Sequence, residues 1–297
     1  MISLILDTDI GDDVDDVFAL AYVARRPDVR LVGVSTVIGD TAWRAAIALR
    51  LFDELGVNDV PVCAGHAANS AGQMTRQPSR ISGDVFVPLG AVDRRTDRRP
   101  VEEFVRDLAK SAPDPVWLGT IGPATNAAAA IRRFPEIRDR LAGIAMMGGR
   151  FEPENIGEYN FSTDAQAAVE VCGCGVPVVV GDFLVTRQAQ LTRSDLSRIS
   201  TAPGVGPSLA TQLKTYLDRC DRDATSMYDP LSLTAALGVR YLSRHPKTFV
   251  ASVEEGHVRF TPSAAPTNLH LAREADPAAF HEDLLRTIER SPAPNRA

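Results

Sequence analysis

The sequence predicts an α/β fold in which a mainly parallel central sheet is flanked by helices, with a Rossmann-like core. Short runs of Val, Ile and Leu alternate with Ala- and Leu-rich segments through the first two-thirds of the chain, as in repeated βα units. The apolar residues of the longer segments recur at helical spacing. At 297 residues and 44% hydrophobic content, the chain can bury one large core, so we expect a single domain over residues 1–297.

Each predicted strand is followed by a predicted helix. The expected strands are residues 3–6, 31–37, 60–63, 116–118, 144–147 and 176–180. The expected helices are residues 16–24, 42–55, 101–111, 124–134 and 164–171. Ligands of such sheets bind beyond the carboxyl ends of the strands, so functional residues should follow the strands directly.

The rest of the chain is less regular. Residues 65–100 are rich in Arg, Gly, Ser and Pro without clear periodicity, which indicates a surface excursion that could form a lid or a pocket wall. Residues 194–237 have a helical pattern with a break at residues 203–207. Residues 248–271 resemble strands and hairpins, and a closing helix is expected at residues 277–290.

Charge and length exclude some classes of partner. The net charge of -6 and pI near 5.4 leave no broad basic field for a phosphate backbone, so nucleic acid is not expected as a partner. A small molecule or a cation fits better. The apolar run at residues 2–6 is too short for a secretory segment or a membrane span, so we expect a cytoplasmic protein without a membrane partner.

The sharpest feature is a run of acidic residues directly after the first predicted strand. Six carboxylates fall within ten residues, namely Asp7, Asp9, Asp12, Asp13, Asp15 and Asp16. The macrodipole of the following helix accounts for one or two of them. The others would repel one another unless a divalent cation neutralises them. Oxygen ligands suit calcium or magnesium better than zinc, and no Glu closes the run as in an EF-hand.

A strand followed by Asp-x-Asp is also typical of haloacid dehalogenase-like phosphohydrolases. In that hypothesis Asp7 would be the nucleophile, with magnesium bound beside it. The additional acidic pair Asp15 and Asp16, and the lack of a clear downstream Lys and Asp-Asp motif, count against this alternative.

Four further motifs follow in order along the chain. They are Gly122-Pro123-Ala124-Thr125-Asn126, Met146-Met147-Gly148-Gly149, Glu158-Tyr159-Asn160-Phe161 with Asp164, and Asp229-Pro230-Leu231. Together with the aspartate run, this ordered set resembles the inosine-uridine preferring nucleoside hydrolase family. The resemblance implies a nucleoside hydrolase-like fold, a small-molecule ribonucleoside substrate, and assembly as a homodimer or homotetramer.

The resemblance also implies an activity and a metal site. The reaction is hydrolysis of the N-glycosidic bond of a ribonucleoside to free base and ribose. Ca²⁺ is expected on the carboxylates of Asp9, Asp16 and Asp229 and on the backbone carbonyl of Ile121. Asp9 is expected to be the general base that activates the calcium-bound water. An oxocarbenium-like sugar explains why anionic groups are needed around the ring.

The substrate contacts implied by the resemblance involve four residues. Asp15 resembles the carboxylate that contacts a ribose hydroxyl, and Glu158 and Asn160 resemble the groups that hold the other hydroxyls. Asp40 stands where many members have an Asn that touches the sugar.

Two departures from the family pattern leave alternatives open. Two extra residues lie between Asp9 and Asp15, so Asp13 rather than Asp15 could face the sugar. Tyr228 stands where several members have a His that protonates the leaving base, and it could act as the acid or stack on the base, with His66 as another candidate acid. The replaced His also favours an alternative function, a metal- and ribose-binding relative that acts on an unusual N-riboside or lacks hydrolase activity.

Overall fold

The computed structural model describes residues 1–74, 83–151, 157–239 and 241–291. The strands are β1 (Ile2–Thr8), β2 (Val29–Thr36), β3 (Val62–Ala64), β4 (Val116–Thr120), β5 (Leu141–Met147), β6 (Val178–Gly181), β7 (Gln190–Thr192), β8 (Ala224–Ser226), β9 (Leu242–Arg244), β10 (Phe249–Glu254), β11 (His257–Pro262) and β12 (Leu269–Ala275). The α-helices are α1 (Asp15–Arg25), α2 (Thr41–Leu55), α3 (Val101–Ser111), α4 (Thr125–Arg133), α5 (Tyr159–Thr163), α6 (Ala165–Cys172), α7 (Phe183–Thr186), α8 (Leu196–Ser200), α9 (Gly206–Arg219), α10 (Tyr228–Leu233) and α11 (Pro277–Ile288). Three short 3₁₀ helices are Gly83–Val85, Pro135–Arg140 and Arg193–Asp195.

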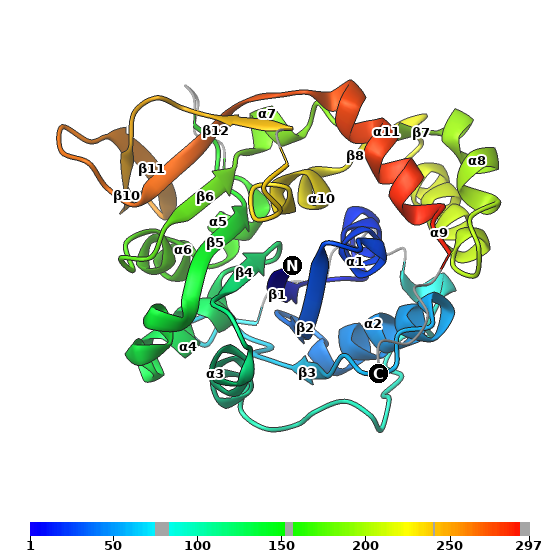
Figure 1. Cartoon of the computed structure of the whole chain (residues 1–297), viewed down its shortest axis with the longest axis horizontal. Coiled ribbons are helices and arrows are strands. Elements are labelled where there is room, and N and C mark those ends of the chain that lie inside the picture. Colours follow the sequence, from blue (N-terminus) through cyan, green and yellow to red (C-terminus); the bar gives the residue numbers. More distant parts are fainter. Residues whose placement is uncertain (75–82, 152–156, 240, 292–297) are drawn as a thin grey trace.

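One large sheet runs through the molecule (Figure 1), in the order β11-β10-β12-β6-β5-β4-β1-β2-β3, with β9 paired to β12. All neighbouring strands from β12 to β3 are parallel. The strands β9, β10 and β11 join in antiparallel pairs. The predicted α/β class with a mainly parallel sheet and a Rossmann-like core is therefore confirmed, and the six strands predicted in its parallel part are all present.

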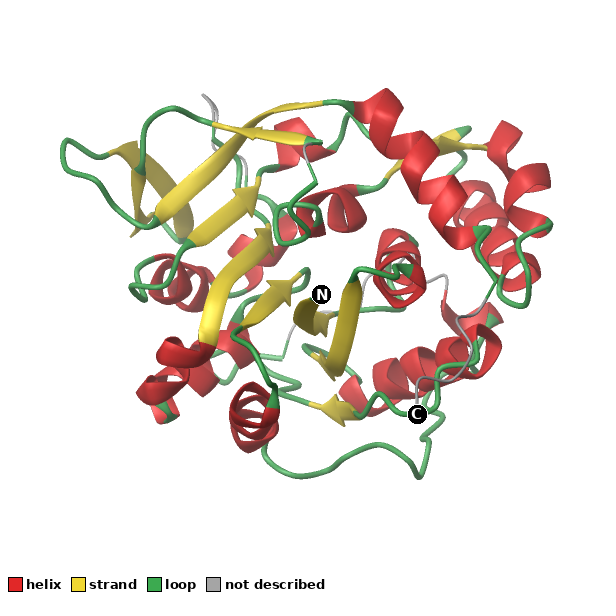
Figure 2. Cartoon of the chain, viewed as in Figure 1, coloured by secondary structure: helices red, strands yellow, loops and turns green. Residues whose placement is uncertain are grey.

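Helices cover both faces of the sheet (Figure 2), and the alternation of side chains along β1 explains how each face is filled. Leu4 and Leu6 point into a core shared with α1, α2, α9 and α11. Ile5 points the other way, into a core shared with α3, α4 and α6. A strand that is buried on both sides must be apolar at successive positions, as the sequence of β1 is.

The strand order places a binding crevice between β1 and β4. From β1 the chain adds β2 and then β3 on one side, and later adds β4, β5 and β6 on the other side. The connections that leave β1 and β4 therefore diverge, which opens a crevice beyond their carboxyl ends. The aspartate run follows β1 and the Gly122-Pro123 turn follows β4, so both motifs meet at this point of the sheet.

The region expected to be helical at residues 194–237 contains α8, α9 and α10, with the predicted break between α8 and α9. The prediction was wrong at β8, which pairs in antiparallel fashion with β7. These strands have three residues each, too few to show a period in the sequence, and they exist because they pair with each other. No helix among the described residues is long and apolar enough to cross a membrane.

Candidate active site

A tight loop, residues 9–14, connects β1 to α1 and carries three of the six acids of the run, Asp9, Asp12 and Asp13. Ile10 and Val14 are fully buried and hold this loop against the core. Gly11 has a φ of +117°, and an added Cβ would lie 2.7 Å from the Ile47 side chain, so the turn requires glycine. The loop therefore has a fixed shape, and its backbone sets the positions of its carboxylates.

Arg44 of α2 holds the acidic loop in place through its guanidinium group. Its guanidinium donates to the carbonyl oxygens of Ile38 at 2.7 Å and Ile10 at 2.9 Å, and also to that of Asp9. It forms an ion pair with Asp12, whose Oδ2 lies 2.5 Å from Nη2. No basic side chain was predicted to contact the loop. The available signal was a lone Arg within an otherwise apolar, Ala-rich stretch of helix, where an unpaired charge would be costly.

We predict that Arg44→Leu lowers the free energy of unfolding by about 3–5 kcal/mol, because it leaves Asp12 buried without its partner. Arg44 is only 3% exposed. The matched control is Arg50→Leu on the same helix, since Arg50 is exposed and pairs with Glu54 at the surface. That change should cost about 1 kcal/mol or less. Urea unfolding of both variants measures the difference, and equal losses would contradict a special role for Arg44.

The segment at residues 65–100 supports the same loop and was expected to form a lid or pocket wall. The backbone N–H of Gly83 donates to the carbonyl oxygen of Gly11 at 3.0 Å, and Asp84 pairs with Arg219 of α9 at 2.6 Å. The described residues of this segment do not line the cavity at the crevice, and residues 75–82 of it lie outside the described residues. Gly83 and Asp84 therefore support the aspartate loop from outside the cavity.

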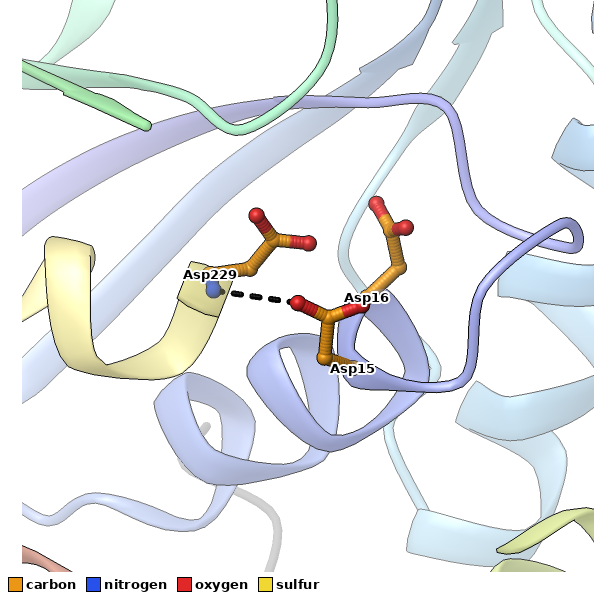
Figure 3. A group of neighbouring side chains, drawn as sticks. All are labelled: Asp15, Asp16 and Asp229. Atoms are coloured by element: carbon orange, nitrogen blue, oxygen red, sulfur yellow. Dashed lines mark hydrogen bonds between the residues drawn. The ribbon is translucent and has the colours of Figure 1, made fainter. Parts of the chain in front are cut away.

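Three carboxylates meet at the floor of the crevice (Figure 3). Asp15 and Asp16 lie in the first turn of α1 and Asp229 in the first turn of α10, and one oxygen of each lies within 4.8 Å of the others. The backbone N–H of Asp229 donates to Asp15 Oδ2 at 3.2 Å, and Thr8 donates to Asp16. Helices from distant parts of the sequence thus bring these acids together.

The electrostatics of this group favour a bound cation. Burial, followed by the charges of neighbouring carboxylates, raises the pKa of Asp15, Asp16 and Asp229 well above the usual value. No Lys, Arg or His is among the described residues that line the cavity. A donor set of carboxylate oxygens in a cavity whose described lining has no cationic side chain fits a hard divalent cation such as calcium or magnesium.

Asp9 lies beside this group and lines the same cavity. Burial raises the pKa of its carboxyl to about 7, while the charge of Arg44 acts in the opposite direction. Gly122 packs directly against it: an added Cβ at Gly122 would lie 2.9 Å from Asp9 Oδ1. The carbonyl oxygen of Ile121 accepts a hydrogen bond from the Asn160 amide at 2.8 Å, and Ile121 also lines the cavity.

Glu158 and Asn160 form another part of the cavity lining. Glu158 caps α5 by accepting from the backbone N–H groups of Asn160 at 2.8 Å and Phe161 at 3.0 Å. Its Oε2 also accepts from Gly149 N–H at 2.8 Å. Glu158 therefore caps α5 and lines the cavity at the same time.

Aromatic side chains form a wall of the same cavity. The rings of Phe183 and Tyr228 stack with centroids 5.3 Å apart and planes 16° apart, and the Arg150 guanidinium carbon lies 5.9 Å from the Phe183 centroid. Tyr216 of α9 also lines the cavity and is hydrogen-bonded to Asp13. Neither Phe183 nor Tyr216 could be predicted from a motif, because each reaches the site only through the packing of α7 and α9.

Two residues expected in the site lie elsewhere. Asp40 does not line the cavity, and its side chain caps α2 by accepting from Trp43 N–H at 3.0 Å, which corrects the expected sugar contact. His66, a candidate acid, is not among the lining residues either, and its Nε2 lies 3.0 Å from Glu102. Both follow strands of the sheet: Asp40 follows β2, which pairs directly with β1, and His66 follows β3 at the edge.

The position of Asp7 excludes the role of nucleophile. Its side chain is buried beneath the cavity and is not among the lining residues. It accepts from the Ser35 hydroxyl at 2.6 Å and from the Asn126 amide at 2.8 Å. Asp7 is therefore a structural carboxylate that ties β1 to β2 and to α4.

The cavity has a volume of about 460 Å³, which suits a small molecule. Residues 4–282 match the family described as inosine-uridine preferring nucleoside hydrolase. The chain belongs to this family. As a nucleoside hydrolase it is an enzyme that hydrolyses N-glycosidic bonds, and the haloacid dehalogenase-like alternative is wrong.

Individual nucleoside hydrolases are distant in sequence. The chain is 30% identical to the non-specific ribonucleoside hydrolase RihC of Salmonella agona, over 76% of this chain and 75% of the relative. It is 28% identical to uridine nucleosidase 1 of Arabidopsis thaliana, over 79% of this chain and 73% of the relative. The solved structure of a purine-preferring ribonucleoside hydrolase from Gardnerella vaginalis superposes with a TM-score of 0.85 at 24% identity, over 97% of this chain and 98% of that chain. This last likeness supports the fold.

Proposed function

We propose that this nucleoside hydrolase cleaves ribonucleosides to free base and ribose with the help of calcium at the acidic floor of the cavity. The observation that carries the proposal is the group of three buried carboxylates, Asp15, Asp16 and Asp229, in a cavity that also has an aromatic wall. The hydroxyls of a sugar ring can bind to the carboxylates of the floor, and the flat face of a nucleobase can stack on the aromatic wall. One cavity can thus hold both halves of a ribonucleoside.

The metal site proposed here uses the carboxylates of Asp9, Asp16 and Asp229 and the carbonyl oxygen of Ile121, all of which line the cavity. When bound, calcium would supply Lewis-acid chemistry, orienting the ribose hydroxyls and lowering the pKa of a water molecule. Calcium is preferred to magnesium because its coordination shell is larger and more flexible and can admit hydroxyls of a sugar.

Asp9 is proposed as the general base. Its carboxylate lines the cavity beside the proposed calcium site, where it can accept the proton of a water molecule. Asp15, Glu158 and Asn160 are proposed to hold the ribose hydroxyls, and the place of Asp15 in the carboxylate group supports Asp15 over Asp13 for this role. As the C–N bond breaks, the sugar gains positive charge, which the surrounding carboxylates stabilise.

Tyr228 is proposed to contact the leaving base by stacking. Its ring already lies parallel to Phe183, and burial raises the pKa of its hydroxyl further above the ordinary value of 10. A phenol with a pKa above 10 is a poor acid at neutral pH. The ring, rather than the hydroxyl, is therefore the functional part of Tyr228.

Two substitutions separate these roles of Tyr228. Tyr228→Phe keeps the ring and should leave kcat within about threefold, whereas loss of an acid would lower it by about 10²-fold or more. Tyr228→Ala removes the stacking face and should raise KM by about 5- to 100-fold. Steady-state kinetics on the best ribonucleoside measure both, and a collapse of kcat in Tyr228→Phe would restore the role of acid.

The reaction itself is tested by incubating the calcium-loaded protein with purine, pyrimidine and modified ribonucleosides and separating the released bases by chromatography. Release of a free base together with ribose supports the proposal. Saturable ribose binding without turnover of any substrate would overturn it and favour the metal- and ribose-binding relative. The cytoplasmic location, the homodimer or homotetramer and the single domain over residues 1–297 stay predictions.

A further inference from the structure

A second cavity lies at the end of the sheet opposite the acidic floor. Its described lining comes from the last turn of α1, the first residues of β2, and the segments that lead into β3 and β4. It shares no described lining residue with the active-site cavity, and its volume of about 840 Å³ is enough for a small organic molecule. The proposed reaction leaves this second cavity unused.

The charged residues of the second cavity are mainly arginines. Those in its described lining are Arg25, Arg26, Arg30 and Arg290. The same lining has one acidic residue, Asp59. Arg26 is neutralised by ion pairs with Asp28 at 2.7 Å and with Asp283 at 3.0 Å. The other three arginines form no ion pair with any carboxylate that the structure describes, so positive charge is in excess here.

Arg25 is the most deeply buried of the three, with only 7% of its surface exposed. Its guanidinium donates to the carbonyl oxygen of Pro203 at 2.7 Å and to that of Arg290. Its Nε is buried and has no hydrogen-bond partner among the described residues. Burial lowers the pKa of Arg25, and no described carboxylate counteracts that effect. The charge of Arg25 therefore lacks a counter-ion in the described part of the chain, which is costly at this depth.

Helix dipoles explain only part of this charge. The helix α1 ends beside the cavity, and a basic residue near the C-terminus of a helix is favourable, which accounts for Arg25 and Arg26. The dipole of α1 does not account for Arg30, which lies on β2. It also does not account for the contact by which Arg25 meets Arg290, a residue that follows α11. Several arginines from different elements thus line one cavity.

The walls of the second cavity indicate what kind of anion fits it. The planar fork of an arginine matches the oxygens of a phosphate group, whose charge of roughly −1.5 to −2 suits more than one arginine. Leu31, Val57 and Val60 line the same cavity and pack against the core, so part of the wall is apolar. An inorganic anion would make no use of this apolar wall, whereas the organic part of a phosphate ester can pack against it.

We propose that the second cavity binds a small organic phosphate through Arg25, Arg30 and Arg290, with the organic part against the apolar wall. A sugar phosphate and a nucleotide share this chemistry, and a binding experiment separates them. Binding here is independent of the proposed hydrolysis, because the two cavities have no described lining residue in common.

The experiment is isothermal titration calorimetry of calcium-loaded protein, freed of excess calcium, with inorganic phosphate, ribose 5-phosphate and 2′-deoxycytidine 5′-monophosphate. The deoxynucleotide lacks the 2′-hydroxyl that calcium in the active site would bind. At least one organic phosphate should bind about 10-fold more tightly than inorganic phosphate, because it also buries apolar surface. The double substitution Arg30→Gln with Arg290→Gln should weaken its binding by about 100-fold, and Arg30→Gln alone by about 10-fold, as expected for charged hydrogen-bond donors.

The matched control is Arg244→Gln, an exposed arginine on β9 that is not among the described residues lining either cavity. Its affinity for the organic phosphates should equal that of the wild type. Arg30 and Arg290 are exposed, so both test variants should keep the wild-type Tm and the wild-type rate of ribose release.

The relative affinities for the two organic phosphates identify the ligand. Tighter binding of ribose 5-phosphate identifies a sugar phosphate, and tighter binding of the deoxynucleotide identifies a nucleotide. Unchanged affinity in the single and double variants overturns the proposal. Inorganic phosphate that binds as tightly as both organic phosphates, or a failure of both to bind at about 10 mM, overturns it as well.

Discussion

Asp9→Asn should lower kcat for ribonucleoside hydrolysis by about 10³-fold, within the range expected for loss of a general base. Asn keeps the shape of the side chain but cannot accept the proton of water, and it removes one charge beside the developing positive sugar. The backbone around Asp9 is held by Arg44 and by the close contact with Gly122, so the loop should keep its shape. Initial rates of ribose release measure the effect.

The control for this substitution is Asp40→Asn. Asp40 caps α2 outside the cavity, and Asn is as good a helix cap as Asp, so both activity and stability should stay at the wild-type level. A fall in activity in Asp40→Asn comparable with that of Asp9→Asn would contradict the assignment of the two residues. Nearly full activity of Asp9→Asn would exclude Asp9 as the base.

The second large effect is a pH-dependent loss of stability when calcium is removed. In the metal-free protein the pKa of Asp9 is raised to about 7, and burial raises the pKa of Asp7 to about 7 as well. The pKa values of Asp15, Asp16 and Asp229 are also raised well above the usual value of an aspartate. In the unfolded chain these acids ionise near pH 4, so the folded state binds more protons above that pH.

A raised pKa in the folded state means that stability is present at low pH and is lost as the pH rises. The metal-free protein should therefore unfold at a lower temperature at pH 8 than at pH 5. Calcium at about 100 times its Kd adds about 2.7 kcal/mol, or roughly 5–10 °C in Tm, and the gain should be larger at pH 8, where the ligands are ionised. Differential scanning calorimetry with and without EGTA measures both trends.

The control is a double substitution, Asp16→Asn with Asp229→Asn. It removes two of the repelling carboxylates, so the metal-free variant should show a flatter dependence of Tm on pH and no response to calcium. A calcium response that persists in this variant would place the ion elsewhere. A metal-free wild-type protein that becomes more stable from pH 5 to pH 8 would contradict the buried-carboxylate account.

The sequence predicted the parts of the site that lie directly after strands. Alternation of apolar runs and helices identified β1 and β4, and the acidic run and the Gly122-Pro123 turn follow these two strands. Because the carboxyl ends of neighbouring parallel strands meet, these motifs had to converge. Asp229 was predicted as a site residue from the family resemblance, because nothing in the sequence around it indicates that it lies near the aspartate run.

The side chains that surround these motifs could not be predicted in the same way. Arg44, Phe183 and Tyr216 reach the site from three helices whose relative positions depend on tertiary packing. Asp40 was expected at the sugar because it stands where many members of the family have an Asn, but the turn into α2 uses its carboxylate as a cap. Local hydrogen bonding at a helix start decided that position.

The most direct test of the account measures bound calcium and ribose release on the same samples. The protein is dialysed against EGTA, calcium is returned in steps, and the bound ion per chain is compared with the rate of ribose release. We predict that the rate rises in proportion to bound calcium and levels off at about one ion per chain. Full-rate release of ribose from calcium-free protein would contradict the account.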